Sequence, residues 1–201
     1  MDKKTNVRQN ILDSALILFS EKGYEGVSVS EMTEVSGITK PTLYYYFGNK
    51  EGLFDAVCCE NYGRLNSIVT KSAEYIPHPE NYYSDIYKAL HNIVSAYFPF
   101  AVENEAFYRL VMANMHVPRS SVAFDVVQKY HYVQYEIVGK MFQDMAVSHG
   151  NLMDKDKRLS WSFIGTINAY IGIAFSGLME ESLSKNTAKE LVHQFMHGIY
   201  A

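Results

Sequence analysis

Residues 39–47 place hydroxyl, phenol and ammonium groups on one side of a predicted helix. Thr39 is a candidate N-cap, and Pro41 falls in the first turn, where a missing N–H costs nothing because that donor has no partner within the helix. At about 100° per residue, Leu43 and Phe47 share one face. The opposite face carries Pro41, Thr42, Tyr44 and Tyr45, with Lys40 at its leading end. Groups of this kind can bind phosphate and form hydrogen bonds with the edges of bases.

A short helix with its own capping signals precedes this segment. Ser28 can cap it, and the side chain of Glu31 can reach back to the cap, as in a capping box. Gly37 can take the left-handed conformation that ends a helix and starts a turn. The helical spacing points three side chains inward, those of Val29, Met32 and Val35.

The flanking sequence can hold these two helices in place. Gly48 ends the central helix, Asn49 can cap another, and Lys50 falls in its first turn, beside N–H groups that favour an anion. Before the segment, residues 7–23 have the spacing of an amphipathic helix that ends at Gly23. We expect this first helix to be a brace that fixes the angle of the central helix.

Taken together, these signals resemble the helix-turn-helix of the TetR family of transcriptional regulators. The resemblance rests on the capping box, Gly37, the run from Thr39 to Phe47, the triplet Asn49-Lys50-Glu51 and Leu53, and it is specific over about residues 7–65. It implies an all-α fold with an N-terminal three-helix DNA-binding domain and a larger C-terminal helical domain that binds a small molecule and dimerises. The implied division is 1–48, with the motif at about 28–47, and 49–201.

The resemblance also implies which side chains contact DNA. In this family the third helix enters the major groove, and many members have histidine where this chain has Tyr46. The implied base contacts are Lys40, Pro41, Thr42 and Tyr44. The implied phosphate contacts are Ser28, Ser30, Thr39, Tyr45, Tyr46 and Lys50.

The charge of the chain is unusual for a DNA-binding protein, because the formal net charge is -4 and a basic balance is the usual electrostatic footprint. Within residues 1–50, six lysines and arginines offset six acidic residues. The basic residues nevertheless lie at the N-terminal arm (Lys3 and Lys4) and at the starts of the third and fourth helices. We therefore expect modest non-specific DNA binding that still depends on salt.

Cysteine content and hydropathy bear on the compartment. The two cysteines, Cys58 and Cys59, are adjacent on a predicted helix and cannot easily form a mutual disulfide. We interpret them as core residues, with a thiol sensor as the alternative. No run approaches the ~18 apolar residues of a membrane span. The sequence predicts a soluble, cytoplasmic protein without a membrane partner.

The remainder of the chain reads as a series of amphipathic helices. A linking helix from residue 49 or 50 carries a buried stripe and is broken by two prolines within residues 72–81. A helix through residues 86–98 is expected to stop at Pro99, and others cover 103–115, 121–147 and 159–181. The last begins near residue 186 or 187, where Thr187 and Glu190 form a second capping box. The stripe of the linking helix is Phe54, Cys58, Tyr62, Leu65 and Val69.

Enzymatic chemistry has little support in the sequence. His193 and His197 have i, i+4 spacing, but no glutamate follows His193 and no third metal ligand is evident. The chain contains neither a phosphate-binding glycine loop nor a nucleophile elbow. We predict no enzyme, no metal and no cofactor.

Polar residues interrupt the apolar stripes of the aromatic-rich C-terminal half. Because buried polar groups need partners, they either satisfy one another or offer hydrogen bonds to a ligand in an aromatic-lined cavity. Under the second alternative, the effector is small and largely apolar. The candidate effector residues are Tyr97, Phe98, Phe107, Met112, Tyr130, Gln134 and Asn168.

The last helix keeps an apolar face almost to residue 201, so it docks either on its own chain or on a second copy. The family resemblance favours a homodimer through the last two helices. The resulting hypothesis is a homodimeric repressor that a small effector releases from a palindromic operator of double-stranded DNA. The alternative is a helical small-molecule or partner-binding protein that does not use its helix-turn-helix.

Overall fold

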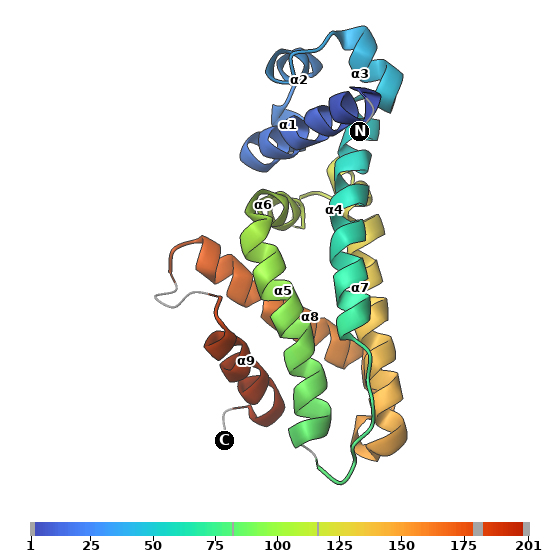
Figure 1. Cartoon of the computed structure of the whole chain (residues 1–201), viewed down its shortest axis with the longest axis vertical. Helices are drawn as coiled ribbons and strands as arrows, with labels where there is room; N and C mark the ends of the chain where they lie inside the picture. The colour runs from blue at the N-terminus through green and yellow to red at the C-terminus, as the bar shows by residue number, and fades with distance from the viewer. Residues whose placement is uncertain (1–2, 82, 116, 179–182, 199–201) are drawn as a thin grey trace. The chain divides into compact units, whose positions relative to one another are not determined.

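The computed structural model describes residues 3–81, 83–115, 117–178 and 183–198, and these residues form helices and no strand (Figure 1). The prediction of an all-α fold is therefore confirmed. A short π-helical segment, Tyr83–Tyr87, precedes α5, and a 3₁₀ turn, Gly150–Leu152, follows α7. The helices are α1 Lys3–Gly26, α2 Val29–Val35, α3 Lys40–Phe47, α4 Lys50–Ser72, α5 Lys88–Glu103, α6 Glu105–Asn114, α7 Val122–Ser148, α8 Asp156–Phe175 and α9 Lys185–His197.

The chain folds into two compact units, and neither is one continuous stretch of sequence. The first contains residues 1–63 and 104–131, and the second contains 64–103 and 132–201. The first unit thus holds α1, α2, α3 and α6 with the first parts of α4 and α7. The predicted domain boundary after residue 48 divides the chain by sequence position and not by contacts, so it stays a prediction.

The core of the first unit forms where α1 packs against α6 and α2 (Figure 1). Side chains of α1, α3 and α4 are fully buried there, among them Phe19, Leu43 and Phe54. Phe19 and Phe54 meet edge to face with ring centroids 4.9 Å apart. Aromatic pairs in this geometry add to the stability of plain area burial. The role of the first helix as a brace for the central helix stays a prediction.

Local signals explain the ends of α2, with one correction. The Ser28 hydroxyl accepts the Glu31 N–H at 3.2 Å, as expected for an N-cap. The Glu31 carboxylate accepts a hydrogen bond from the Ser28 backbone, which is the reciprocal half of the predicted capping box, and it also binds the Lys22 ammonium. Val35 is 56% exposed, so its predicted inward position is wrong. Thr33, 8% exposed, lies on the buried side of this short helix instead.

The linking helix α4 agrees closely with its predicted stripe, since Phe54, Cys58, Tyr62, Leu65 and Val69 are all buried. Burial raises the pKa of the Cys58 thiol, because a thiolate would lose its hydration there. Cys59 is exposed, so the interpretation as a core residue is wrong for it. Among the described residues, no helix has both the length and the hydropathy needed to cross a membrane.

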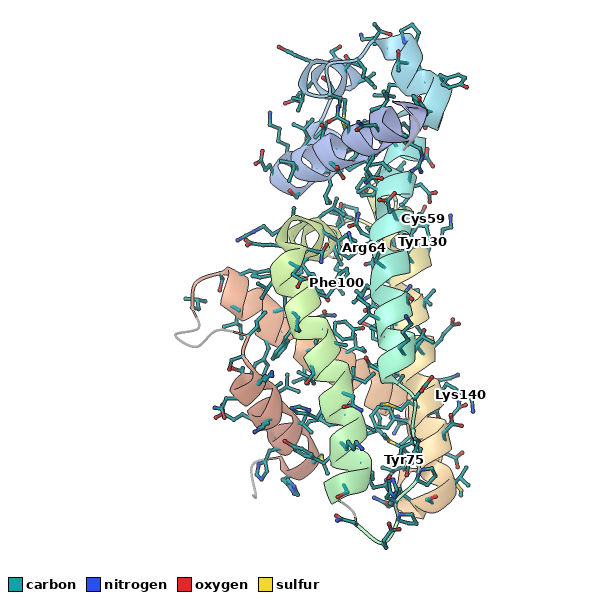
Figure 2. The ribbon with its side chains drawn as sticks, viewed as in Figure 1. Cys59, Arg64, Tyr75, Phe100, Tyr130 and Lys140 are labelled. Atoms are coloured by element: carbon teal, nitrogen blue, oxygen red, sulfur yellow. The ribbon has the colours of Figure 1, made fainter. Side chains whose placement is uncertain are left out.

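In the second unit, α5 packs against α9 and α8 (Figure 1). The prediction that Pro99 ends this helix is wrong, because α5 continues to Glu103. Proline removes one backbone donor, but the next two residues, Phe100 and Ala101, are both buried, and their burial offsets the loss. The Arg64 guanidinium from α4 lies 5.8 Å from the centre of the Phe100 ring (Figure 2).

The N-cap of α9 lies three residues before the predicted one. Ser184 is the N-cap, and its hydroxyl accepts the Thr187 N–H at 3.1 Å. Thr187, predicted as the cap, is a buried helical residue. A serine three residues earlier can satisfy the first free N–H groups, so the helix extends towards its N-terminus. In α8 the side chains of Phe163, Ile167 and Ile171 are buried. The helix ends at Phe175, and its predicted end, residue 181, lies outside the described residues.

Candidate nucleic-acid interface and effector residues

The outward face of α3 carries the side chains predicted to contact bases. Tyr44 is 46% exposed, and both Lys40 and Pro41 are exposed, while Thr42 is half-buried. On the opposite face Leu43 is fully buried. The structure therefore brings the four predicted residues to one surface of one helix. A single helix with an exposed polar face fits the major groove, whose base edges offer donors, acceptors and methyl groups.

The hydroxyl groups at the start of α3 are ordered by its cap. The Thr39 hydroxyl accepts the Thr42 N–H at 3.4 Å and lies 2.9 Å from the Thr42 hydroxyl. Pro41 occupies the first turn, as predicted. Gly37 and Gly48, at φ 64 and 76, end α2 and α3 in the left-handed region that glycine tolerates. Both ends of α3 are thus set by residues that the sequence identified.

Most residues predicted to bind phosphate lie on the surface. Ser28, Ser30 and Thr39 are exposed, and Tyr45 is 73% exposed. Tyr46 is half-buried, and its ring meets that of Tyr45 edge to face at 5.2 Å. These hydroxyl and phenol groups can donate hydrogen bonds to phosphate oxygens.

Lys50 departs from this pattern, because its ammonium is already engaged within the protein. Its Nζ donates to the Val27 carbonyl oxygen at 3.0 Å and lies 4.2 Å from the centre of the Tyr24 ring. The residue is half-buried. Its position at the start of α4 was predicted, whereas these two partners were not.

Gly52 is a residue of this region that sequence reasoning missed. A Cβ at this position would lie 2.1 Å from the Phe47 carbonyl oxygen, so only glycine fits the turn from α3 to α4. The Gly52 N–H also donates to the Asn49 side chain at 2.7 Å, which confirms Asn49 as a helix cap. The signal in the sequence was a glycine in the first turn of a helix, where it costs about 1 kcal/mol relative to alanine unless geometry requires it.

The candidate effector residues fall into the two compact units. In the first, Phe107 and Tyr130 both contact Tyr62, with ring centroids 4.9 and 6.0 Å away. The Tyr130 hydroxyl donates to Asp55 Oδ1 at 2.9 Å, and Tyr130 lies beside Cys59 of α4 (Figure 2). Sequence reasoning identified Phe107 and Tyr130 as aromatic residues of a cavity but missed that Tyr62 lies between them.

In the second unit, the Tyr97 hydroxyl donates to Gln134 Oε1 at 2.6 Å, and both side chains are buried. Phe98, next to Tyr97, is buried as well. The first of the two alternatives for buried polar groups, mutual satisfaction, therefore applies to this pair in the present conformation. Among the contacts of the described residues, the half-buried Met112 and Asn168 join neither this pair nor the cluster around Tyr62.

The two histidines of α9 lie together, with the ring centroids of His193 and His197 4.7 Å apart. Within the described residues, no group of three or more histidine, cysteine or acidic side chains is placed to hold a metal ion.

Comparison with known sequences bears on the first unit. Residues 11–57 match the sequence profile of the family described as bacterial regulatory proteins, tetR family. The HTH-type transcriptional repressor AcnR of Corynebacterium glutamicum is 39% identical over 71 residues, which are 35% of this chain and 38% of that protein. The negative transcriptional regulator IcaR of the biofilm operon icaADBC of Staphylococcus aureus is 37% identical over 65 residues, 31% and 34% of the two chains. The chain thus matches less than two fifths of the length of these relatives.

Comparison with solved structures covers nearly the whole chain. The regulator FadR of Bacillus subtilis, solved in complex with stearoyl-CoA, has a TM-score of 0.76 at 15% identity, covering 95% of this chain and 98% of that chain. The TetR-family regulator PfmR of Thermus thermophilus has a TM-score of 0.70 at 19% identity, covering 94% and 95%. At such low identity the similarity establishes the fold.

The first unit thus has a capped α3 with an exposed polar face and a buried reverse side, and the helical fold is shared with a solved structure along 95% of the chain. Residues 11–57, which include the capped helices of the first unit, are similar in sequence to the tetR family of bacterial regulatory proteins. These two relatives are named as a transcriptional repressor and as a negative transcriptional regulator. That this chain is not an enzyme stays a prediction.

Proposed function

We propose that this chain is a DNA-binding transcriptional regulator, a homodimeric repressor that a small, largely apolar effector releases from a palindromic operator. The observation that carries the proposal is the face of α3, where Tyr44 and Tyr45 are exposed while Leu43 on the reverse side is fully buried. Phenol groups on such a face can donate hydrogen bonds to base edges and to phosphate oxygens.

The proposed contacts follow from the exposed groups of this face. Base contacts come from Lys40, Pro41, Thr42 and Tyr44, and phosphate contacts come from Ser28, Ser30, Thr39, Tyr45 and Tyr46. Phosphate contacts fix the register of a protein on DNA, and base contacts supply the sequence preference. Lys50, the remaining residue for which the resemblance implies a phosphate contact, has partners inside the protein and is considered separately below.

The proposed dimer uses α8 and α9. Trp161, Gly165, Ala169 and Ile173 follow each other at intervals of four along α8, and all are exposed. Such a row lies along one side of a helix, and its small members allow a second helix to approach closely. Two recognition helices related by two-fold symmetry should stand about 34–36 Å apart to fit successive turns of the major groove.

The proposed effector is largely apolar, and its proposed contacts are Tyr97, Phe98, Phe107, Met112, Tyr130, Gln134 and Asn168. The solved complex of FadR with stearoyl-CoA supports this chemistry for a protein of the same fold. In the present conformation Tyr97 and Gln134 bond to each other, so an effector that inserts between them would have to replace that bond. A ligand shifts the population of states only by its differential affinity for them.

DNA binding is tested by the mobility shift of the promoter DNA that adjoins the gene encoding this chain, at moderate salt. Tyr44→Ala should weaken specific binding by about 1–3 kcal/mol, that is, about 5- to 150-fold, with a smaller effect on non-specific DNA. Tyr132→Ala is the control, since Tyr132 is also an exposed tyrosine, 59% exposed on α7 against 46% for Tyr44. Equal losses in both variants would contradict the assignment of α3 as the reading helix. Absence of any shift would favour the alternative, a helical binding protein that does not use its helix-turn-helix.

Effector placement is tested separately with Gln134→Leu and Asn168→Leu. We expect these variants to bind DNA as the parent does and to release it at altered concentrations of lipophilic compounds selected by thermal shift. Unchanged release in both variants would show that the effector contacts lie elsewhere.

A further inference from the structure

We propose that Lys50 is a positioning residue of the helix-turn-helix, which acts through Val27 and Tyr24 instead of as a direct phosphate contact. The inference rests on the proposed DNA-binding function, because what Lys50 positions is the reading helix. The contacts that carry it are the hydrogen bond from Nζ to the Val27 carbonyl oxygen, at 3.0 Å, and the placement of Nζ 4.2 Å from the Tyr24 ring centre.

The Val27 carbonyl lies at a point where the chain needs an external donor. Helix α1 is interrupted at Gly23, with φ 68 and ψ 170, and the chain then turns towards the N-cap of α2 at Ser28. The Val27 side chain is 2% exposed, so this connection is packed against the protein interior. A charged donor forms a stronger hydrogen bond to a carbonyl than a neutral one does. Through this hydrogen bond Lys50, the first residue of α4, holds the residue that precedes the N-cap of α2.

Tyr24 gives the ammonium a rigid second partner. Its ring is 9% exposed and is held by Phe19, at 5.9 Å in a stacked pair, and by Phe54, at 5.0 Å edge to face. A cation over the face of a fixed aromatic ring gains more than one over a mobile ring, because no ordering cost is added on contact. Both contacts therefore hold the Lys50 ammonium at the α1–α2 connection.

The exit from α3 is held by the same short turn. The Asn49 side chain caps α4 through the Gly52 N–H at 2.7 Å, and the Phe47 carbonyl oxygen occupies the space that a Gly52 side chain would need. Residues 49–52 therefore hold the helix-turn-helix at both of its ends, through Lys50 at the entry to α2 and through Asn49 and Gly52 at the end of α3. The angle at which α3 projects depends on both ends being held.

The test compares Lys50→Met, which keeps an unbranched stem of similar length, with Lys40→Met as the matched control. Lys40 is exposed, and none of the contacts of the described residues uses its ammonium. In the free protein, Lys50→Met should lower Tm by about 3–6 °C, since it removes a charged hydrogen bond from a chain of this size, and Lys40→Met should leave Tm unchanged. In the parent protein the Lys50 ε-methylene protons should resonate upfield through the Tyr24 ring current, and Tyr24→Leu should abolish that shift.

DNA binding then separates positioning from phosphate contact. Lys50→Met should reduce specific affinity by about tenfold more than non-specific affinity, with the slope of log affinity against log salt unchanged. Lys40→Met should flatten that slope by about 0.9 per protomer, as the loss of a cation at the DNA surface requires. The proposal is overturned if Lys50→Met keeps the parent Tm and flattens the slope by the same amount. A parent protein that shifts no DNA yet shows the ring-current shift and the loss of Tm would overturn the proposed function alone.

Discussion

Acidification should destabilise the first unit through His131, a buried histidine of α7. His131 is 3% exposed, and its Nδ1 lies 3.2 Å from the Tyr62 hydroxyl. Burial lowers the pKa of His131 from 6.5 to about 4, because the protonated ring would lose its hydration. The neutral form is therefore the one that the folded protein holds.

The sign and size of the effect follow from these two pKa values. Since the pKa is lower in the folded state than in the unfolded state, the contribution of His131 is fully present above pH 6.5 and is lost as the pH falls towards 4. The full pKa difference corresponds to about 3 kcal/mol at 1.36 kcal/mol per unit. Between pH 7.5 and pH 5 the unfolded chain gains its proton and the folded one does not, so about 2 kcal/mol of the free energy of unfolding should disappear.

Urea unfolding followed by far-UV circular dichroism at pH 7.5, 6.5, 5.5 and 5 measures this loss. The control is the double variant Tyr62→Phe/His131→Phe, which removes both hydrogen-bonding partners and keeps two rings of similar shape. The variant should lose about 2 kcal/mol less than the parent over this pH range. Parallel pH curves for the parent and the variant would refute the reasoning, because other titrating groups would then account for the whole dependence.

Two further substitutions test the packing that supports the site. Gly52→Ala should destabilise the protein by about 2 kcal/mol or more, the cost of overpacking, because its Cβ would overlap the Phe47 carbonyl oxygen. Gly63→Ala, at an exposed position of α4 with open space around it, should instead stabilise the protein by about 0.5–1 kcal/mol. Urea unfolding measures both free energies, and equal effects would contradict the close approach at Gly52. In the second unit, Asp85→Asn should cost about 1.5–3 kcal/mol in the same assay, since the buried Asp85 carboxylate bonds the His149 ring at 2.6 Å, and an unchanged midpoint would show that this pair contributes nothing net.

The helices of the first unit were predictable because their ends are marked by short-range signals. Ser28, Thr39 and Asn49 each cap the helix that follows, and each accepts a hydrogen bond from an N–H only three residues away. Gly37 and Gly48 occupy the left-handed region that only a few residue types tolerate. The exposed face of α3 followed from the helical period alone, since one side of that helix had to bury Leu43.

The errors arose where distant parts of the chain decide the outcome. Local propensity ends a helix at Pro99, but burial of the residues that follow extends α5 past it. The inward position of Val35 was inferred from spacing, and which face of a two-turn helix is covered depends on the elements packed against it. The partners of Lys50 were equally unpredictable, because Val27 and Tyr24 lie more than twenty residues away in sequence.

The contacts of the cations change what the neutral charge of residues 1–50 means for DNA binding. Arg8 pairs with Glu60 at 3.5 Å, Lys22 pairs with Glu31, and Lys50 bonds the Val27 carbonyl. Of the cations whose side chains the structure describes in this segment, Lys40 alone is exposed without such a partner. Since the salt dependence of binding counts the cations that neutralise phosphates, a protein built in this way should bind DNA with a shallow salt slope. Its sequence preference would then depend on the hydroxyl and phenol groups of α3, which are uncharged and are positioned by the packing of that helix.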